Sequence, residues 1–326
     1  MLRTFLLAAA ATALMATAAA AQSPIVMKVG TSIAGENHPL VITVGRWAQL
    51  VKQRSNGRIE IQLFPNGQLG GEVEMAEALR LGSLEATANT LTVFSRWIPE
   101  AEIFDLPFLF KDDDHALRVY NGAPGKKLAE LFPAQGFRVL GFSLAGVRQP
   151  FGAFPINTPD DVKGRKMRVI QSPLHIAIWT AVGANPTPIP APEIYNALQT
   201  KLVDFADNTK TNFVNQKWNE VAPHFSVLSH VYAIGGMFIS ESWWKKQTPE
   251  DQKILADSWA ELVPTLHHLV AYQDELSLIK AQAGGTKVTI VRDKEPWRKA
   301  MLPIWEQWAA KVPAGKAMID EVVATQ

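Results

Sequence analysis

The chain alternates short apolar runs with amphipathic stretches through its first third. Residues 26–31, 58–64 and 84–89 have the length and apolar content of strands. Between them, residues 39–54 and 72–81 place apolar side chains at the spacing of a helix face. Strands that alternate with helices are typical of βαβ units on a mainly parallel sheet. The pattern therefore predicts an α/β fold.

A long helical pattern marks the last third of the chain. Thr248 and Pro249, followed by two acidic residues, form a helix start, and Gly284 with Gly285 forms a stop. An unbroken helix over residues 249–283 would be about 50 Å long at about 1.5 Å per residue. That length exceeds the width of one lobe of about 150 residues. The helix is therefore predicted to span two lobes.

The length of the chain also predicts two lobes. The chain has 326 residues, and single hydrophobic cores stop growing at roughly 250–300 residues. We assign residues 24–145 together with 235–268 to lobe I. Residues 146–234 together with 269–326 are assigned to lobe II.

The first residues have the pattern of a targeting segment. Arg3 is followed by an apolar run at 5–15 and by small residues at 19–21. A basic start, a short apolar core and a small-residue end predict a cleaved secretory signal peptide over residues 1–21, and hence a periplasmic location. The alternative is a membrane anchor, which needs about 20 apolar residues. The apolar run is shorter than that.

Composition narrows the classes of partner and of chemistry. The net charge is +1 without any block of lysine or arginine, so we expect no nucleic-acid partner. The absence of cysteine excludes disulfides, thiolate metal sites and a cysteine nucleophile. The acidic run before His115 favours a helix cap over a metal site. Without the motifs of zinc proteases or nucleotide-binding loops, we expect no metal, no cofactor and no enzymatic activity.

One charged side chain stands out in the middle of the chain. Residues 166–170 alternate charged and apolar side chains as a half-buried strand does, so Arg168 points to the opposite face from its two neighbours. A guanidinium fixed on a strand offers two parallel donors that match a carboxylate. By spacing alone, Arg168 is equally able to form a structural salt bridge with Asp204 or Asp207.

Polar residues also follow the predicted strands of the first third. In open α/β sheets, small ligands bind beyond the carboxyl ends of the strands. Glu72, Asn89 and Thr90 lie at such ends or in the segments beyond them. Each of them alone also suits the role of a helix cap or turn residue.

Four segments within residues 156–208 form a recognisable series. They are the Lys-x-Arg-Val strand at 166–169, the glycine and proline loop at 183–190, the helix at 193–199 and the Val-Asp-x-x-Asp-Asn strand at 203–208. This series resembles the substrate-binding proteins of tripartite ATP-independent periplasmic (TRAP) transporters, of the dicarboxylate-binding (DctP) family. The resemblance extends over nearly the whole chain beyond the signal peptide. It departs at Lys201 and Phe205, where the family usually has glycine, and at Asp207, where it usually has glutamate.

The resemblance implies a two-lobed periplasmic binding protein fold with a hinge, a ligand cleft between the lobes and a long helix behind both. It implies a monomeric receptor that captures a small organic acid and delivers it to the small and large membrane subunits of a TRAP transporter. Arg168 would hold the ligand carboxylate, Asn208 would donate to it, and Arg148 would assist. The other residues that would shape the pocket are Glu72, Asn89, Thr90, Gln171 and Phe213.

Two other functions remain open from the sequence. One is a periplasmic enzyme that acts on an acidic metabolite, and the other is a subunit that presents a bound acid to a membrane sensor. The class of acid also stays open. C4-dicarboxylates, uronates and other sugar acids, and aromatic or oxo acids all carry the carboxylate that Arg168 would bind.

Overall fold

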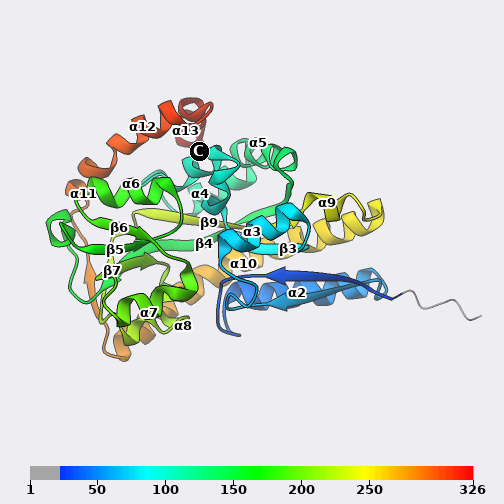
Figure 1. Cartoon of the computed structure of the whole chain (residues 1–326), viewed down its shortest axis with the longest axis horizontal. Helices are drawn as coiled ribbons and strands as arrows, with labels where there is room; N and C mark the ends of the chain where they lie inside the picture. Colours follow the sequence, from blue (N-terminus) through cyan, green and yellow to red (C-terminus); the bar gives the residue numbers. More distant parts are fainter. Residues whose placement is uncertain (1–22, 326) are drawn as a thin grey trace, which may run out of the picture.

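The computed structural model describes residues 23–325. They form two lobes built on strands and helices, which confirms the predicted α/β fold (Figure 1). The predicted signal peptide, residues 1–21, lies outside the described residues. Within the described range, we find no helix that combines the length and the apolar character needed to cross a bilayer.

Lobe I is built on three parallel strands. β1 (Ile25–Gly30) lies between β2 (Ile59–Phe64) and β3 (Ala86–Thr90) and pairs in parallel with both. The crossovers are α2 (Pro39–Arg54) and α3 (Glu72–Leu81). This is the predicted βαβ arrangement, with strand ends shifted by one or two residues. The apolar faces of the first two strands and α2 form a buried cluster that includes Met27, Val29, Val44, Trp47, Ile59 and Ile61.

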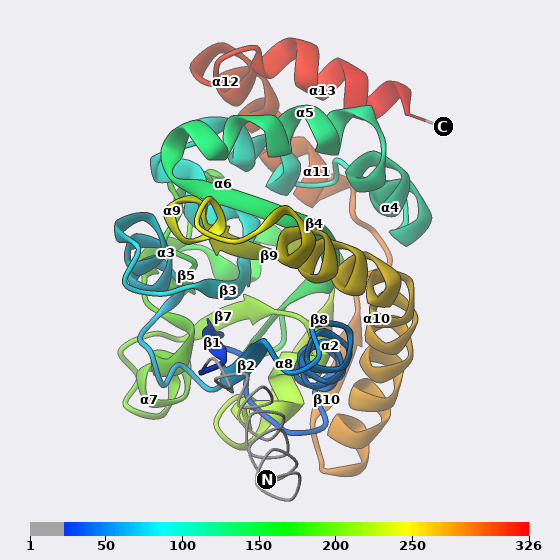
Figure 2. The ribbon, with the colours of Figure 1, turned by 90° about the vertical axis from the view of Figure 1, so that its right-hand side faces the viewer.

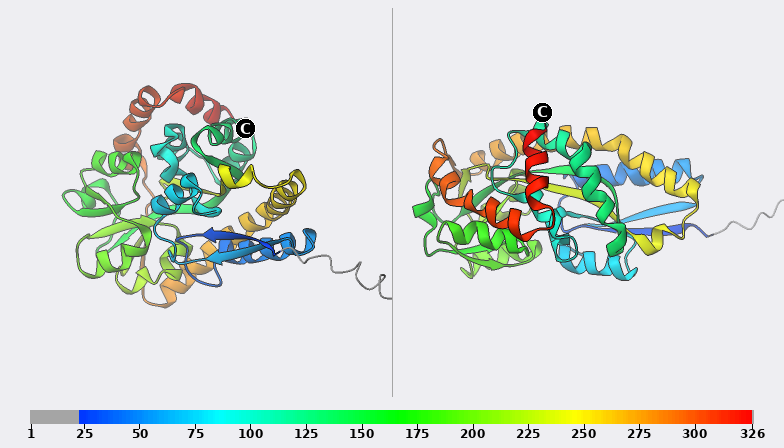
Figure 3. Two further views of the ribbon diagram at one scale, coloured as in Figure 1. Left: turned by 45° about the vertical axis from the view of Figure 1, so that its right-hand side comes forward. Right: turned by 90° about the horizontal axis from the view of Figure 1, so that it is seen from above.

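Two long strands carry the sheet from one lobe into the other. β4 (Phe137–Gly152) and β9 (Val231–Ser240) pair antiparallel from Phe137 opposite Ser240 to Arg148 opposite Val231. β9 pairs with β3 in lobe I, while β4 pairs with β7 (Phe205–Asn208) in lobe II. Seen from above in Figure 3, these strands run between the two lobes. The exact lobe boundaries stay a prediction.

Lobe II continues the sheet beyond β7. β5 (Lys166–Val169) pairs in parallel with β7 and with β6 (Asn185–Pro188). On the other side, β8 (His224–Val227) pairs with β4 and with β10 (Lys287–Ile290). The helices of this region are α6 (Pro173–Ala181), α7 (Ile194–Gln199) and α8 (Lys210–Asn215).

The long helix forms as predicted. α10 (Pro249–Ala283) starts where the Thr248 hydroxyl accepts a hydrogen bond from the Asp251 amide, at 3.1 Å. It packs against α2 in lobe I and against α8 in lobe II, and Figure 2 shows it along one side of the molecule. Pro264 lies inside the helix. α10 thus joins the two lobes behind the sheet.

The remaining helices are short. The C-terminal region consists of three helices, and Pro303 starts the second of them. The bounds are α4 (Asp113–Asn121), α5 (Ala123–Leu131), α9 (Glu241–Trp244), α11 (Glu295–Met301), α12 (Pro303–Lys311) and α13 (Gly315–Ala324), with 3-10 turns at Leu91–Arg96, Pro99–Asp105, Pro133–Gln135, Pro159–Val162, Ala191–Glu193 and Trp218–Glu220.

Candidate functional site

A cavity lies between the lobes, where the ends of β1 and β3 face β4, β5 and β7. Its empty volume is about 490 Å³, part of which is open to solvent. The residues that line it come from both lobes and include five of the eight that the sequence analysis expects at the ligand site. It consists of Ser32, Ile33, Glu72, Thr90, Ala145, Arg148, Arg168, Ile170, Ala191, Asn208, Thr209, Asn212, Gln216, Trp218 and Ala233.

The lobes approach closely around this cavity. The Gln216 side-chain amide in lobe II donates to the Ser32 carbonyl in lobe I, at 3.2 Å. At the rim, a Cβ atom on Gly67 would lie 2.8 Å from Cγ of Pro192 in the opposite lobe. Only a residue without a side chain allows this approach. The structure is therefore a closed arrangement of the cleft.

Arg168 is buried, with 2% of its surface exposed. Its Nε donates to the Ile189 carbonyl at 2.8 Å, and its two terminal nitrogens donate no hydrogen bond to any residue in 23–325. Burial, and then the charge of Arg148, lowers the pKa of Arg168 to about 10. The guanidinium therefore remains charged at neutral pH, and its fork is free for a ligand.

The alternative salt bridge of Arg168 does not form. Asp204 instead accepts a hydrogen bond from the Lys166 amide at 2.8 Å. Asp207 accepts from Nε and Nη2 of Arg148 at 2.8 and 2.7 Å, a bidentate pair. The structural reading of Arg168 is thus wrong with respect to both aspartates.

Arg148, Asp207 and His230 form a buried cluster beside the cavity. His230 Nε2 lies 3.0 Å from Asp207 Oδ2. Burial opposes the ionisation of Asp207, but the charge and hydrogen bonds of Arg148 outweigh it and hold the pKa of Asp207 well below its usual range. Burial lowers the pKa of His230, so the neutral ring donates its Nε2 proton to the carboxylate. The charge of Arg148 is therefore balanced within the protein.

Asn208 presents its amide nitrogen to the cavity. Its Oδ1 accepts hydrogen bonds from the Thr209 amide at 2.8 Å and from the Asn212 side chain at 2.9 Å. With the oxygen occupied by two donors, Nδ2 is the group left for a ligand. A carboxylate held by Arg168 could accept from this nitrogen as well.

Glu72 lies on the lobe I side of the cavity, in the first turn of α3. Its Oε1 accepts from the Thr90 amide at 3.0 Å and from the Thr90 hydroxyl at 2.8 Å. Asn89 fixes the same turn by donating to the Glu72 carbonyl at 2.8 Å. Glu72 is close enough to act electrostatically on both cavity arginines. The carboxylate is held in place and faces the guanidiniums across the cavity.

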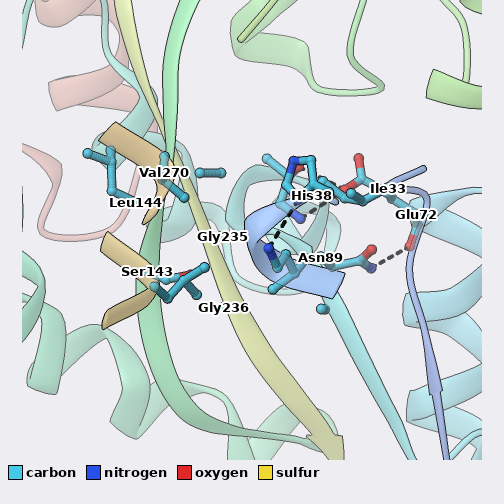
Figure 4. A pocket seen from close by; sticks show the side chains of 14 residues that line it. Ile33, His38, Glu72, Asn89, Ser143, Leu144, Gly235, Gly236 and Val270 are labelled. Atoms are coloured by element: carbon cyan, nitrogen blue, oxygen red, sulfur yellow. Dashed lines mark hydrogen bonds between the residues drawn. The ribbon is translucent and has the colours of Figure 1, made fainter. Parts of the chain in front are cut away.

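A second, mostly apolar chamber adjoins the cavity and shares Ile33, Glu72, Thr90 and Ala145 with it (Figure 4). We call it the inner chamber; its empty volume is about 420 Å³. Burial lowers the pKa of His38, at its edge, to about 4, so this ring is neutral. The other lining residues are Leu40, Ala88, Asn89, Ser143, Leu144, Gly235, Gly236, Leu266 and Val270.

Two predicted pocket residues lie elsewhere. Phe213 is 1% exposed and packs between Phe151 and Phe225, with ring centroids 4.9 and 4.7 Å away. It points into the core because α8 turns its preceding residue, Asn212, toward the cavity. Gln171 lines a separate surface groove together with Arg96 and Pro188. The structure therefore places neither residue at the cavity between the lobes.

The structure adds residues that the sequence analysis did not select. Asn212, Gln216 and Trp218 line the cavity from the segment that follows β7. No sequence motif marks them, because a short helix and a left-handed turn at Lys217 decide which side chains face inward. In the described range there is no group of three or more histidine, aspartate or glutamate side chains arranged to hold a metal.

Comparison with known proteins gives a consistent result. Residues 30–311 match the model of the bacterial extracellular solute-binding protein family 7, DctP. The C4-dicarboxylate-binding periplasmic protein DctP of Shewanella loihica is 29% identical, covering 90% of this chain and 88% of its own length.

Two solved structures share the fold at similar identity. A TRAP periplasmic solute binding protein from Xanthobacter autotrophicus with bound β-D-galacturonate has a TM-score of 0.88 and 29% identity, covering 92% of this chain and 100% of that one. Another, from Sulfurospirillum deleyianum with bound succinate, has a TM-score of 0.88 and 31% identity, covering 94% of this chain and 100% of that one.

Proposed function

Because the chain belongs to the bacterial extracellular solute-binding proteins of family 7, we propose that it captures a small organic acid in the cleft between its lobes. The two structural relatives hold galacturonate and succinate, and both ligands carry a carboxylate. The same kind of ligand suits the cavity of this chain.

The observation that carries the proposal is the contrast between the two cavity arginines. Arg148 has its own counter-ion in Asp207, whereas Arg168 has a single backbone carbonyl. A buried charge without a partner is costly, so it favours an anion that can enter the cleft. A ligand carboxylate would accept two parallel hydrogen bonds from the Arg168 fork and a further one from Asn208.

Closure of the lobes would strengthen this binding. Residues of both lobes line the cavity, so the ligand is enclosed only when the lobes meet. Removal of water lowers the local dielectric and increases the attraction between guanidinium and carboxylate. Hinge closure of this kind is a common mode of ligand capture by periplasmic binding proteins.

The proposal extends to location and partners. The chain would act in the periplasm after removal of residues 1–21, and it would deliver the acid to the small and large membrane subunits of a TRAP transporter. The family membership and the relatives with bound acids support this role. The enzyme alternative needs a titratable group beside Arg168, and the carboxylates of Glu72 and Asp207 are already bonded to Thr90 and Arg148.

Calorimetric titration tests the role of Arg168. Galacturonate and succinate are titrated into the secreted protein, and the tighter acid is then used with the variants. Arg168→Ala leaves the ligand carboxylate buried and unpaired, so we expect a loss of affinity of roughly 100-fold to several thousandfold. Arg168→Lys should recover part of it, since an ammonium lacks the planar fork.

The matched control is Arg165→Ala. Arg165 is exposed and stacks on Phe154 at 4.6 Å, so its removal changes the net charge by the same amount without touching the cavity. It should leave the affinity unchanged. Normal affinity in Arg168→Ala, or the same loss in both variants, would contradict the proposed carboxylate site.

A further inference from the structure

The polar groups that line the cavity have opposite hydrogen-bonding character on its two sides. On the lobe II side, Arg168 and Asn208 present N–H donors, because the acceptor atom of Asn208 is already occupied. On the lobe I side, Glu72 presents an acceptor. Its Oε1 takes both hydrogen bonds from Thr90, while its Oε2 accepts none from the residues in 23–325.

A second acceptor lies beside Glu72. Asn89 is 4% exposed, and its amide donates to the Glu72 carbonyl. Its Oδ1 is buried and has no hydrogen-bond partner within the described part of the chain. Figure 4 shows Asn89 next to Glu72 at the inner chamber. Buried polar groups are nearly always bonded, so an acceptor of this kind points to a missing donor.

Building on the proposed function, we infer that the ligand is a monocarboxylate with hydroxyl groups at the end away from its carboxylate, an acid of the sugar-acid type. The carboxylate occupies Arg168 and Asn208. The distal hydroxyls donate to Oε2 of Glu72 and to Oδ1 of Asn89. Glu72 is thus the residue that selects hydroxylated acids against dicarboxylates.

Charge is the reason for this selection. Arg148, Arg168 and Glu72 line the cavity, and Asp207, buried behind the lining, balances the charge of Arg148. A dicarboxylate bound to Arg168 would bring its second carboxylate toward Glu72, and two like charges that share a water-poor site repel each other. A hydroxyl group in the same place donates to Glu72 instead. Hydrogen bonds to a charged acceptor are the stronger kind.

The test is a calorimetric comparison of D-galacturonate, succinate and hexanoate at pH 7.5. Hexanoate supplies a carboxylate without hydroxyls or a second charge. We expect the wild-type protein to bind galacturonate at least about tenfold more tightly than either of the others. Tighter binding of succinate, or equal binding of hexanoate, would overturn the inference without any variant.

Glu72→Gln then isolates the carboxylate. Its amide oxygen can still accept from Thr90, while its nitrogen replaces Oε2, so the turn keeps its bonds. We expect galacturonate affinity to fall about 10- to 100-fold and succinate affinity to rise about tenfold. The control, Glu74→Gln, makes the same charge change at an exposed position of α3 and should leave the ratio of the two affinities unchanged.

The outcomes separate this inference from the proposed function. If Arg168→Ala abolishes binding while Glu72→Gln leaves the ratio of galacturonate to succinate affinity unchanged, the carboxylate site stands and the selection by Glu72 falls. If Arg168→Ala binds galacturonate normally, the proposed function falls, and with it the orientation assigned to the ligand. If the wild type binds none of the three acids at millimolar concentration, both fall.

Discussion

The surroundings of Arg148 and Arg168 differ more than their positions do. Both arginines lie on strands that flank β7 and are almost equally buried, at 3% and 2% exposure. Arg148 is held by Asp207, which is held in turn by His230, whereas Arg168 has one carbonyl partner. Burial alone therefore does not distinguish a structural arginine from a ligand-binding one. The two residues differ in their counter-ion, which Arg148 has and Arg168 lacks among the described residues.

Asp207→Asn should have the largest effect on stability. It removes the charge that balances Arg148 and leaves two uncompensated buried guanidiniums, so we expect a loss of about 3 to 5 kcal/mol in the free energy of unfolding. Urea unfolding without ligand measures it. Asp204→Asn is the control, since Asp204 is only partly buried and bonds to one backbone amide. Similar losses in both variants would mean that the buried pair of Arg148 and Asp207 contributes no more to the free energy of unfolding than the single contact of Asp204.

His38, unlike the two buried arginines, is a buried basic group that is uncharged at neutral pH. Its pKa is about 4 in the folded protein and about 6.5 when unfolded. Because the folded pKa is the lower one, the neutral ring contributes stability above pH 6.5 that is lost as the pH falls toward 4, on the order of 3 kcal/mol in all.

Urea unfolding at pH 7.5 and at pH 4.5 tests this prediction. Burial lowers the pKa of His267 to about 4 as well, so the wild type and His38→Gln are compared directly. The variant should lose less stability on acidification than the wild type. Equal losses would show that His38 does not contribute to the pH dependence.

Phe213→Leu separates the core from the cavity. The leucine keeps most of the apolar volume beside Phe151 and Phe225, so we expect a cost of about 1 kcal/mol in stability and unchanged ligand affinity. Asn212→Ala, one residue earlier, should do the reverse, because Asn212 lines the cavity. Chemical unfolding and calorimetry of both variants decide between the two roles. A selective loss of affinity in Phe213→Leu would return Phe213 to the ligand site.

Arg168→Met should have the smallest effect on the ligand-free protein. No carboxylate loses its partner, so the free energy of unfolding should change by no more than about 1 kcal/mol. Arg148→Met should cost several times as much, because it leaves Asp207 buried and unpaired. Melting and urea curves of the two variants make the comparison. Equal costs would mean that Arg168 has a structural role after all.

Local signals in the sequence were enough for many elements of the fold. The bounds of α10 follow from Thr248 and Pro249 at one end and the glycines at the other, because caps and stops act within one turn. The direction of Arg168 follows from the two-residue period of a strand. The βαβ order of lobe I follows from the alternation of short apolar strand runs with stretches that have the spacing of a helix face.

Long-range pairing was not visible in the sequence. The apolar alternation does not mark the full length of β4, because its two bulges and its charged residues at 138 and 148 interrupt the pattern. β9 contains Gly235 and Gly236, which weaken a strand pattern. The partner of Arg148 lies 59 residues away, and only the pairing of β4 with β7 brings the two together. The choice between Asn212 and Phe213 depended on the rotation of one short helix.

Pro264 makes one turn of α10 easier to bend than the others. Proline has no N–H, so the helix lacks the hydrogen bond that would tie residue 264 to the carbonyl of residue 260. A helix that spans two lobes and lacks a backbone hydrogen bond at one turn bends most easily at that turn. Leu266, one half-turn further on, lines the inner chamber. When the lobes move relative to each other, the turn at Pro264 is therefore where we expect α10 to bend.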